Sequence, residues 1–154
     1  MSTVRGGGVL GHFTMCELAW SVAAGDAAAM PALLRQLYPQ VSAYCRARAR
    51  DTGVSFTEAD RLALEVCHEI LAAVSSVVGA QQPFVRLAYA TAVDAADARF
   101  ARSGDHAGTR MQREILILRT IVGLDLELTA IALGISPRRV RAEQHIALRS
   151  LRAA

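Results

Sequence analysis

The chain has 154 residues, which is enough for one domain or two small lobes. Apolar residues make up 53% of it and aromatic residues only 5%, a balance that favours closely packed helices over a β-sandwich. The net charge of +3 arises in the last third, because residues 1–102 carry nine arginines and nine acids whereas residues 103–154 carry eight arginines and five acids. Such a local surplus attracts phosphate, although a solvated basic helix face would look the same.

Several classes of site are not supported by the sequence. Glu65-x-x-His68 has the spacing of half a carboxylate-bridged di-iron site, but the second Glu-x-x-His is missing. There is no P-loop and no Ser-His-Asp order, so we expect a protein that is not an enzyme and needs no metal or cofactor. The three cysteines lie far apart with no C-x-x-C, which favours reduced thiols over a disulfide or zinc site: Cys16, Cys45 and Cys67.

The longest weakly polar run, residues 70–80, is too short to cross a bilayer. The N-terminal residues do not resemble a signal peptide, because glycines follow their one arginine and Glu17 interrupts the next apolar stretch. We therefore expect a cytoplasmic protein that does not contact a membrane.

The first half of the chain begins with two predicted helices. Residues 1–13 are rich in glycine and are expected to be loose, and a short helix is predicted at about 15–24. Asp26 is placed to cap the next helix. Apolar side chains recur every three or four residues over 27–50, which predicts an amphipathic helix with a kink or a break at Pro39.

Two more helices complete a predicted first lobe, residues 15–102. Thr57 is expected to cap the third helix, which carries an apolar stripe, and Gly79 is expected to end it. Pro83 is placed at the start of the fourth, which we expect to continue to about Arg102.

A polar segment, residues 103–109, predicts the linker between two domains. Beyond it, residues 110–122 have helical spacing and open a second lobe, residues 110–152. No alternation typical of a strand competes with this pattern. The sequence therefore predicts an all-α fold, with a four-helix lobe, a short linker and a three-helix lobe.

Residues 123–152 have the pattern of a helix-turn-helix. Gly123 ends the fifth helix, Asp125 is placed to cap a sixth over 126–133, and Gly134 permits the positive φ of a tight corner. Ser136 is then placed to cap the last helix. The residues expected to face inward and hold the helix crossing are Leu133, Ile135, Val140, Ala147, Leu148 and Leu151.

The opposite face of the last helix carries the residues that we expect to contact DNA. They are Arg138, Arg139, Arg141, Ala142, Glu143, His145 and Arg149. The N-terminal residues of such a helix reach base edges in the major groove, where arginine makes bidentate contacts to guanine. Arg141 and Arg149 are expected to meet phosphates, and Glu143 either accepts from cytosine N4 or balances Arg139. A helix hairpin with an exposed basic face is the alternative.

The helix-turn-helix and the helix before it closely resemble region 4 of extracytoplasmic-function (ECF) sigma factors, actinobacterial members especially. The matching pieces include Gln112-Arg113-Glu114-Ile115, Leu118-Arg119, Gly123-Leu124, Leu133-Gly134, Val140-Arg141 and Gln144-His145. In that family region 4 reads the −35 promoter element and touches the flap of RNA polymerase. The resemblance implies that the last helix has a −35-type target.

The first lobe resembles region 2 of the same family more faintly. The matching pieces, in family order, are Ala24-Gly25-Asp26, Tyr44-Cys45-Arg46-Ala47-Arg48, Ala59-Asp60, Glu65-Val66-Cys67 and Pro83-Phe84. Region 2 binds the clamp helices of the polymerase β′ subunit and opens the −10 element. The resemblance implies RNA polymerase core, promoter DNA and an anti-sigma factor as partners, with Asp60, Glu65, Arg113 and Arg119 as polymerase-binding residues.

The chain also departs from the family pattern. Leu64 stands where the family has a glutamine, and the fourth helix carries Asp94 and Asp97 where it is usually polar or basic. The linker of seven residues reaches about 25 Å, whereas promoter elements about 17 base pairs apart lie about 58 Å apart. The sequence predicts an ECF-type sigma factor that directs initiation; the alternative is a sigma-derived module that binds polymerase or a regulator without initiating transcription.

Overall fold

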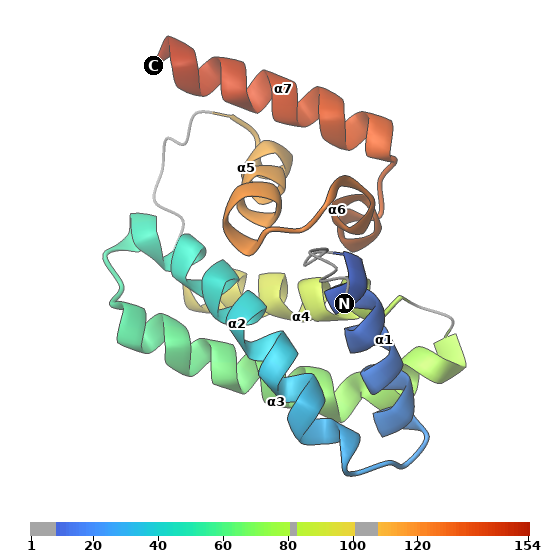
Figure 1. Ribbon diagram of the computed structural model, residues 1–154. Helices are drawn as coiled ribbons and strands as arrows, with labels where there is room; N and C mark the ends of the chain where they lie inside the picture. Colours follow the sequence, from blue (N-terminus) through green and yellow to red (C-terminus); the bar gives the residue numbers. More distant parts are fainter. Residues whose placement is uncertain (1–8, 81–82, 101–107) are drawn as a thin grey trace, which may run out of the picture.

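The computed structural model describes the backbone of residues 9–80, 83–100 and 108–154, and the side chains of residues 15–50, 52–75, 83–100 and 108–154. These residues form helices and no strand, which confirms the all-α fold (Figure 1). In chain order they are α1 (Val9–Ala23), α2 (Ala29–Ala49), η1 (Arg50–Thr52), α3 (Phe56–Ala80), α4 (Phe84–Arg99), α5 (Arg110–Leu116), η2 (Ile117–Val122, a π-helical turn), α6 (Leu126–Leu133) and α7 (Pro137–Ala153).

One expectation for the first helices was wrong, and one of the two alternatives expected at Pro39 did not occur. Helix α1 begins at Val9, inside the segment expected to be loose. Helix α2 is not broken at Pro39, although proline cannot donate the backbone hydrogen bond of that turn. Leu37 and Val41, on either side of the proline, are both buried in the core, so side-chain packing holds the helix together across the missing bond.

The ends of α3 and α4 also differ from the prediction. The hydroxyl of Ser55, not Thr57, caps α3 by accepting a hydrogen bond from the Glu58 N–H at 3.2 Å. The helix continues past Gly79 to Ala80. Helix α4 ends at Arg99, and residues 101–107, which hold the predicted end of this helix and most of the linker, lie outside the described residues.

The last residue of the predicted linker has a structural role that was missed. The Thr109 hydroxyl accepts from the Gln112 N–H, and the Gln112 side chain accepts in return from the Thr109 N–H. This reciprocal capping box satisfies two backbone donors that the start of a helix otherwise leaves open. The chain therefore enters α5 at a defined angle.

The helix-turn-helix forms as predicted. Asp125 accepts from the Leu128 N–H at 2.8 Å at the start of α6, and Ser136 accepts from the Arg139 N–H at 3.2 Å at the start of α7. Gly134 links the two helices with a φ of +67°. These three local features reproduce the cap, turn and cap that the sequence predicts.

The inner face of α7 is shorter than expected. Val140 and Ala147 are buried, but Leu148 is 39% exposed and Leu151 is 55% exposed, so the prediction that both leucines face inward was wrong. Figure 1 shows the reason: α7 lies across α5 and α6, and its C-terminal end extends past α5, where nothing in the described chain covers it.

We expect Gly134→Ala to destabilise the fold by slightly more than Gly123→Ala. Both glycines have a positive φ, +67° and +85°, so both substitutions carry the backbone strain of about 1–2 kcal/mol. A Cβ at Gly134 would in addition lie 2.9 Å from an Arg86 guanidinium nitrogen, so the flexible end of that side chain has to shift at a small further cost, whereas a Cβ at Gly123 meets nothing within 4 Å. Urea denaturation of the two variants, and of Gly134→Ala with Arg86→Ala, checks this; equal midpoints for both single variants would contradict it.

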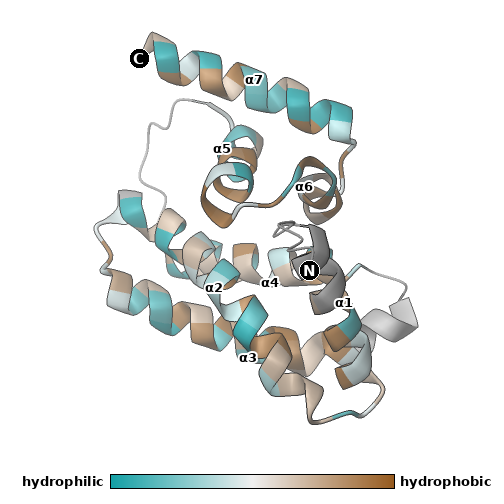
Figure 2. Cartoon of the chain, viewed as in Figure 1, coloured by the Kyte–Doolittle hydropathy of each residue, from teal (hydrophilic) through white to brown (hydrophobic). Residues whose placement is uncertain are grey.

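One hydrophobic core extends through both halves of the chain. Figure 1 shows α5–α7 as a layer above α1–α4, and Figure 2 shows apolar stretches on α5 and α6. The largest apolar cluster joins buried residues of α1–α4 to Ile117, Leu118, Leu124 and Ala132 of the second half. A smaller cluster inside the helix-turn-helix is formed by Ile115, Ala130 and Val140. We call α1–α4 the first lobe and α5–α7 with η2 the second lobe, and the two pack closely.

Candidate DNA interface and interlobe contact

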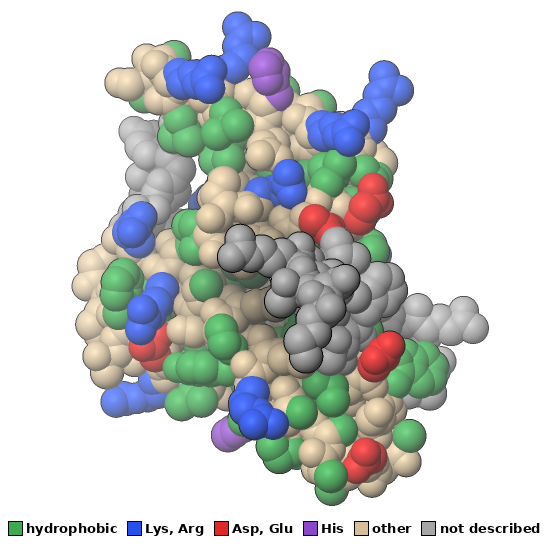
Figure 3. Space-filling view, viewed as in Figure 1, with side chains coloured by type: hydrophobic (Ala, Val, Ile, Leu, Met, Phe, Trp, Pro, Cys, Tyr) green, Lys and Arg blue, Asp and Glu red, His purple; other side chains and the backbone are tan. Residues whose placement is uncertain are grey.

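Helix α7 presents an arginine-rich face to solvent. The burial of Val140 and Ala147 fixes the rotation of the helix about its axis. It leaves exposed most of the residues predicted to contact DNA: Arg138, Arg139, Arg141, Ala142, His145 and Arg149. Figure 3 shows arginine side chains projecting at intervals along this helix.

Within the described part of the chain, no acidic side chain makes an ion pair with Arg138, Arg139, Arg141 or Arg149. Arginines with no acidic partner leave all their donors free for an external anion. The face can therefore take phosphates or base-edge acceptors without first breaking an internal contact.

Glu143 does not belong to this face. Its carboxylate accepts a hydrogen bond from the Gln112 side-chain amide of α5 at 3.0 Å, and its side chain is half-buried. Of the two roles expected of Glu143, an ion pair with Arg139 is not formed among the described residues, and a contact to cytosine stays a prediction. Glu143 therefore links α7 to α5 through this hydrogen bond.

The two acids predicted to bind polymerase already have partners inside the chain. Asp60 accepts two hydrogen bonds from Arg46, at 2.7 and 2.6 Å, and a third from the Ser42 hydroxyl at 2.9 Å. The hydrogen bond from Arg46 holds the pKa of Asp60 below its usual value. Glu65 pairs with Arg99 of α4 at 3.0 Å.

The two predicted polymerase-binding arginines are half-buried within the second lobe. Arg119 donates to the Gln144 side chain at 3.2 Å and to the Leu124 carbonyl at 3.0 Å. Arg113 pairs with Glu114 at 3.0 Å. Both arginines contact residues of their own lobe. They lie on α5 and η2, whereas Asp60 and Glu65 lie on α3.

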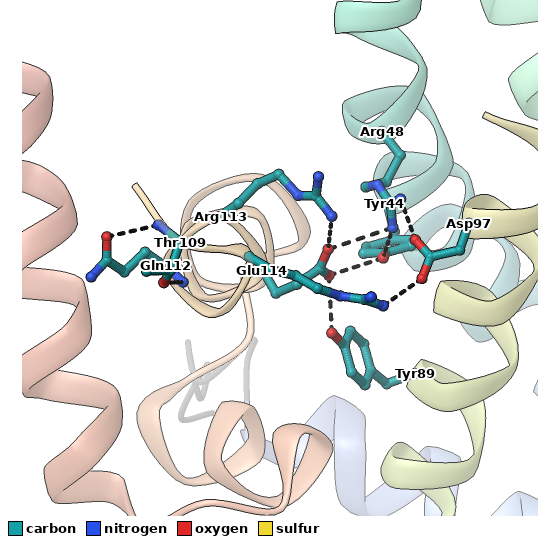
Figure 4. Close-up of polar contacts among 9 residues, drawn as sticks. Tyr44, Arg48, Tyr89, Asp97, Thr109, Gln112, Arg113 and Glu114 are labelled. Carbon is teal, nitrogen blue, oxygen red and sulfur yellow. Dashed lines mark hydrogen bonds and ion pairs between the residues drawn. The ribbon is translucent and has the colours of Figure 1, made fainter. Parts of the chain in front are cut away.

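The contact between the lobes centres on a buried carboxylate that the sequence analysis did not single out. Glu114 of α5 is 2% exposed, and Figure 4 shows it facing side chains of α2 and α4. Its Oε2 accepts from the hydroxyls of Tyr44 at 2.9 Å and Tyr89 at 3.0 Å. Its Oε1 lies 3.0 Å from Arg113 and 3.5 Å from Arg48. Each carboxylate oxygen therefore has two donors, so the buried charge is hydrogen-bonded on all sides.

Arg48 and Asp97 extend this network to the surface. Arg48, whose side chain is 5% exposed, donates to Tyr44 at 2.7 Å and to Asp97 at 2.6 Å, and Asp97 also pairs with Arg110 of α5. Burial works to raise the pKa of Asp97, but the hydrogen bond and charge of Arg48 outweigh it and lower the pKa. Asp97 thus pairs with one arginine of its own lobe, Arg48, and with one arginine of the second lobe, Arg110.

The network raises the pKa of its tyrosines. Burial, together with the negative charge of Glu114, raises the pKa of both Tyr44 and Tyr89. Both phenols therefore stay protonated at neutral pH and act as donors to the carboxylate.

One signal for the network was in the sequence. Arg48 follows Tyr44 by four residues on the apolar face of an amphipathic helix, where a charged residue needs a partner.

Other candidate chemistry finds no support in the residues that the structure describes. No group of three or more histidine, cysteine, aspartate or glutamate side chains is placed to hold a metal ion among them. Burial raises the pKa of Cys45 to about 12 and that of Cys67 to about 11, so neither is a reactive thiolate at neutral pH. None of the described helices combines the length and the apolar character needed to cross a membrane.

The sequence matches curated proteins over most of its length, although no family model matches it. It is 34% identical to the ECF RNA polymerase sigma factor SigD of Mycobacterium tuberculosis, over 84% of this chain and 78% of that protein. It is 32% identical to the ECF RNA polymerase sigma factor ShbA of Streptomyces griseus, over 84% of this chain and 88% of that protein.

The fold also matches a solved structure, that of CnrH in complex with the cytosolic domain of CnrY. The TM-score is 0.69 at 20% identity, covering 91% of this chain and 96% of CnrH. The match extends over both lobes, so a similar arrangement of helices exists in a second, distantly related chain.

Proposed function

The chain belongs to the ECF family of RNA polymerase sigma factors, and from this membership we propose that it directs transcription initiation by binding core polymerase and a −35-type promoter element. The observation that carries the proposal is the exposed arginine face of α7, whose four arginines have no acidic partner among the described residues. A helix of this kind, opened by a cap and a short turn, presents its first residues to the major groove.

We assign different roles to the residues of this face. Arg138 and Arg139 lie in the first turn of α7, where bidentate contacts to guanine are geometrically possible. Arg141 and Arg149 are proposed to neutralise phosphates, and the contribution of each falls as salt rises. Ala142 and His145 complete the surface between them, and Glu143 is left out because Gln112 already binds it.

Polymerase binding is proposed to involve Asp60, Glu65, Arg113 and Arg119. The side chain of Asp60 is 29% exposed and that of Glu65 is 49% exposed, so an external cation can reach both carboxylates. Binding through Asp60 requires it to exchange Arg46 for a basic group on the polymerase. Asp60 is ion-paired both before and after this exchange, which limits the free-energy cost of breaking its contact with Arg46.

An anti-sigma factor is proposed as a further partner. CnrH, which has the same fold, was solved with the cytosolic domain of CnrY, and that complex supports a protein partner for this chain too. We also propose that residues 15–102 and 110–152 are two domains joined by residues 103–109. The alignment to SigD spans 165 positions, more than the 154 residues of this chain, so it contains gaps in this chain. Such gaps are consistent with a shortened member of the family.

The experiment that tests the proposal is run-off transcription with purified core polymerase on a pool of promoter fragments from the source organism. We expect transcripts that require this chain, with core polymerase alone as the control. If the chain co-purifies with core and binds DNA but produces no transcript, the alternative function holds: a sigma-derived module that acts on polymerase or a regulator without initiating. The short linker and the closely packed lobes favour that alternative.

A further inference from the structure

Helix α7 is attached to its lobe by little apolar surface. Of its 17 residues, only Val140 and Ala147 are buried. Val140 packs with Ile115 and Ala130, close to the cap that Ser136 places at the start of the helix. Ala147 contributes a single methyl group, and beyond it the large apolar side chains of α7 are exposed. The first turns of α7 are therefore well anchored, whereas the rest of the helix needs other contacts to keep its direction.

Two polar contacts supply this restraint. Glu143 and Gln144 are neighbours in sequence and lie between the two buried residues, three or four positions from each, so they flank the buried stripe. The Gln112 side-chain amide of α5 donates to the Glu143 carboxylate at 3.0 Å. The Nε of Arg119, on η2, donates to the Gln144 side-chain oxygen at 3.2 Å. Two different elements therefore hold α7, one on each flank of its buried stripe.

Each donor is itself held in place. The Gln112 side-chain oxygen accepts from the Thr109 N–H at 3.2 Å, which directs the amide nitrogen toward α7 (Figure 4). Gln112 is also buried, and a buried amide that loses its partner is costly. Arg119 donates to the Leu124 carbonyl at 3.0 Å, so its guanidinium joins the turn before α6 to α7. Both contacts to α7 therefore act in a defined direction.

We propose that Gln112 and Arg119 are positioning residues that hold α7 at one angle to its lobe. This angle sets the register between the two ends of the DNA-facing surface, Arg138 in the first turn and Arg149 about 16 Å further along the helix. The restraint on the helix follows from the contacts alone, whereas its consequence for DNA rests on the proposed function. Both ends can bind one duplex together only if α7 keeps its direction.

A small swing of the helix is enough to change this register. If α7 pivots at Val140 by about 10°, the Cα of Arg149 moves by about 2 Å, because the two residues are about 13 Å apart along the axis. Hydrogen-bond lengths vary over only about 0.5 Å, so Arg149 has to leave its preferred rotamer to follow its phosphate. The swing therefore weakens the phosphate contact while the helix itself stays folded.

The test exchanges the two partners of one contact. Gln112→Glu sets a carboxylate against Glu143, but a glutamate at this position still accepts from the Thr109 N–H and keeps the capping box of α5. Gln112→Glu with Glu143→Gln, the exchange variant, restores one donor and one acceptor in reversed places and has the net charge of the wild-type chain. Thr120→Glu is the matched control, because it adds the same charge at an exposed position of η2.

Residual dipolar couplings of the α7 amides, measured without DNA, report the direction of the helix relative to α5 and α6. We expect them to change in Gln112→Glu, to recover in the exchange variant and to keep wild-type values in Thr120→Glu. If Gln112→Glu does not fold, Glu143→Ala with Gln144→Ala carries the test, because it breaks both contacts from half-buried positions on α7. Wild-type couplings in every folded variant that lacks a contact overturn the proposal.

The salt dependence of DNA binding measures the consequence for the register. On a duplex that the wild-type chain selects from a random pool, the slope of log affinity against log salt counts the phosphates contacted. We expect the slope to become shallower by about 0.9 in Gln112→Glu, the value of one phosphate, and to recover in the exchange variant. An equal change in Thr120→Glu would show that added charge, not the direction of α7, reduces the slope, and would overturn the register.

The two measurements separate this proposal from the proposed function. Altered couplings with a wild-type slope overturn the role of Gln112 and Arg119 in DNA register. If the wild-type chain selects no duplex, the proposed −35-type binding is contradicted, and the couplings alone support or overturn the positioning of α7. Altered couplings with a shallower slope, both reversed in the exchange variant, support the positioning and the DNA binding together.

Discussion

Replacing Arg138 and Arg139 together by alanine is expected to abolish sequence-specific DNA binding, with a loss of affinity of at least about 30-fold, since one bidentate arginine–guanine pair contributes about 1–3 kcal/mol. Both side chains are exposed in the first turn of α7, with no ion pair within the described part of the chain. Their loss removes no packing, so the fold and the helix content of the variant should match those of the wild-type protein.

The control for this variant has the same net charge as the variant itself. Arg35→Ala with Arg61→Ala also removes two exposed arginines, but from α2 and α3 of the first lobe. A gel shift at one fixed salt concentration, on duplexes selected from a random pool by the wild-type chain, compares the two. Equal affinities for the two double variants would show that only net charge matters, and unchanged binding by Arg138→Ala with Arg139→Ala would remove the recognition role of α7.

Truncating Ile115 to alanine is expected to destabilise the second lobe by about 2–5 kcal/mol, the usual cost of a cavity in a packed core. Ile115 is fully buried, and the separate cluster it belongs to contains only Ala130 and Val140 as further buried members. A cluster this small cannot compensate for the lost packing, because too few neighbouring side chains are present to fill the space of the lost methyl groups. We expect the helix-turn-helix to melt at a lower temperature than the first lobe, and specific DNA binding to be lost with it.

Ile146→Ala is the matched control in the same lobe. Ile146 lies on α7 but is 49% exposed, so its truncation should change the free energy of unfolding by less than about 0.5 kcal/mol. Urea denaturation followed by circular dichroism measures both variants, and hydrogen exchange shows which lobe is affected. If the Ile115 variant unfolds at the same urea concentration as the Ile146 variant, the small cluster does not stabilise the second lobe.

Local sequence signals predicted most of the helix-turn-helix. Asp125, Gly134 and Ser136 act through bonds and backbone angles that involve only a few neighbouring residues, so their roles can be read from the chain alone. The exposed arginines of α7 follow from the same reasoning, because the burial of Val140 and Ala147 at helical spacing fixes where Arg138 and Arg149 point. Helical periodicity likewise predicted the all-α fold.

Predictions failed where contacts distant in sequence outweighed local preference. Pro39 should break a helix, yet α2 continues because Leu37 and Val41 are packed against other helices. Leu148 and Leu151 have inward spacing, but α7 extends past α5 and leaves them without a neighbour to cover them. Periodicity indicates which residues share a face; it does not say how far the facing helix reaches.

The chain's own pattern thus specified the helices, the corner of the helix-turn-helix and the family, because each depends on short-range chemistry or on matching residues in order. The pairing of Glu114 with Tyr44, Tyr89 and Arg48 could emerge only on folding, since the partners lie 70, 25 and 66 residues away. No local rule connects groups so far apart, and their burial depends on how two lobes dock. The same docking brings Arg110 of α5 to Asp97, an acid on α4 that also pairs with Arg48 of its own lobe.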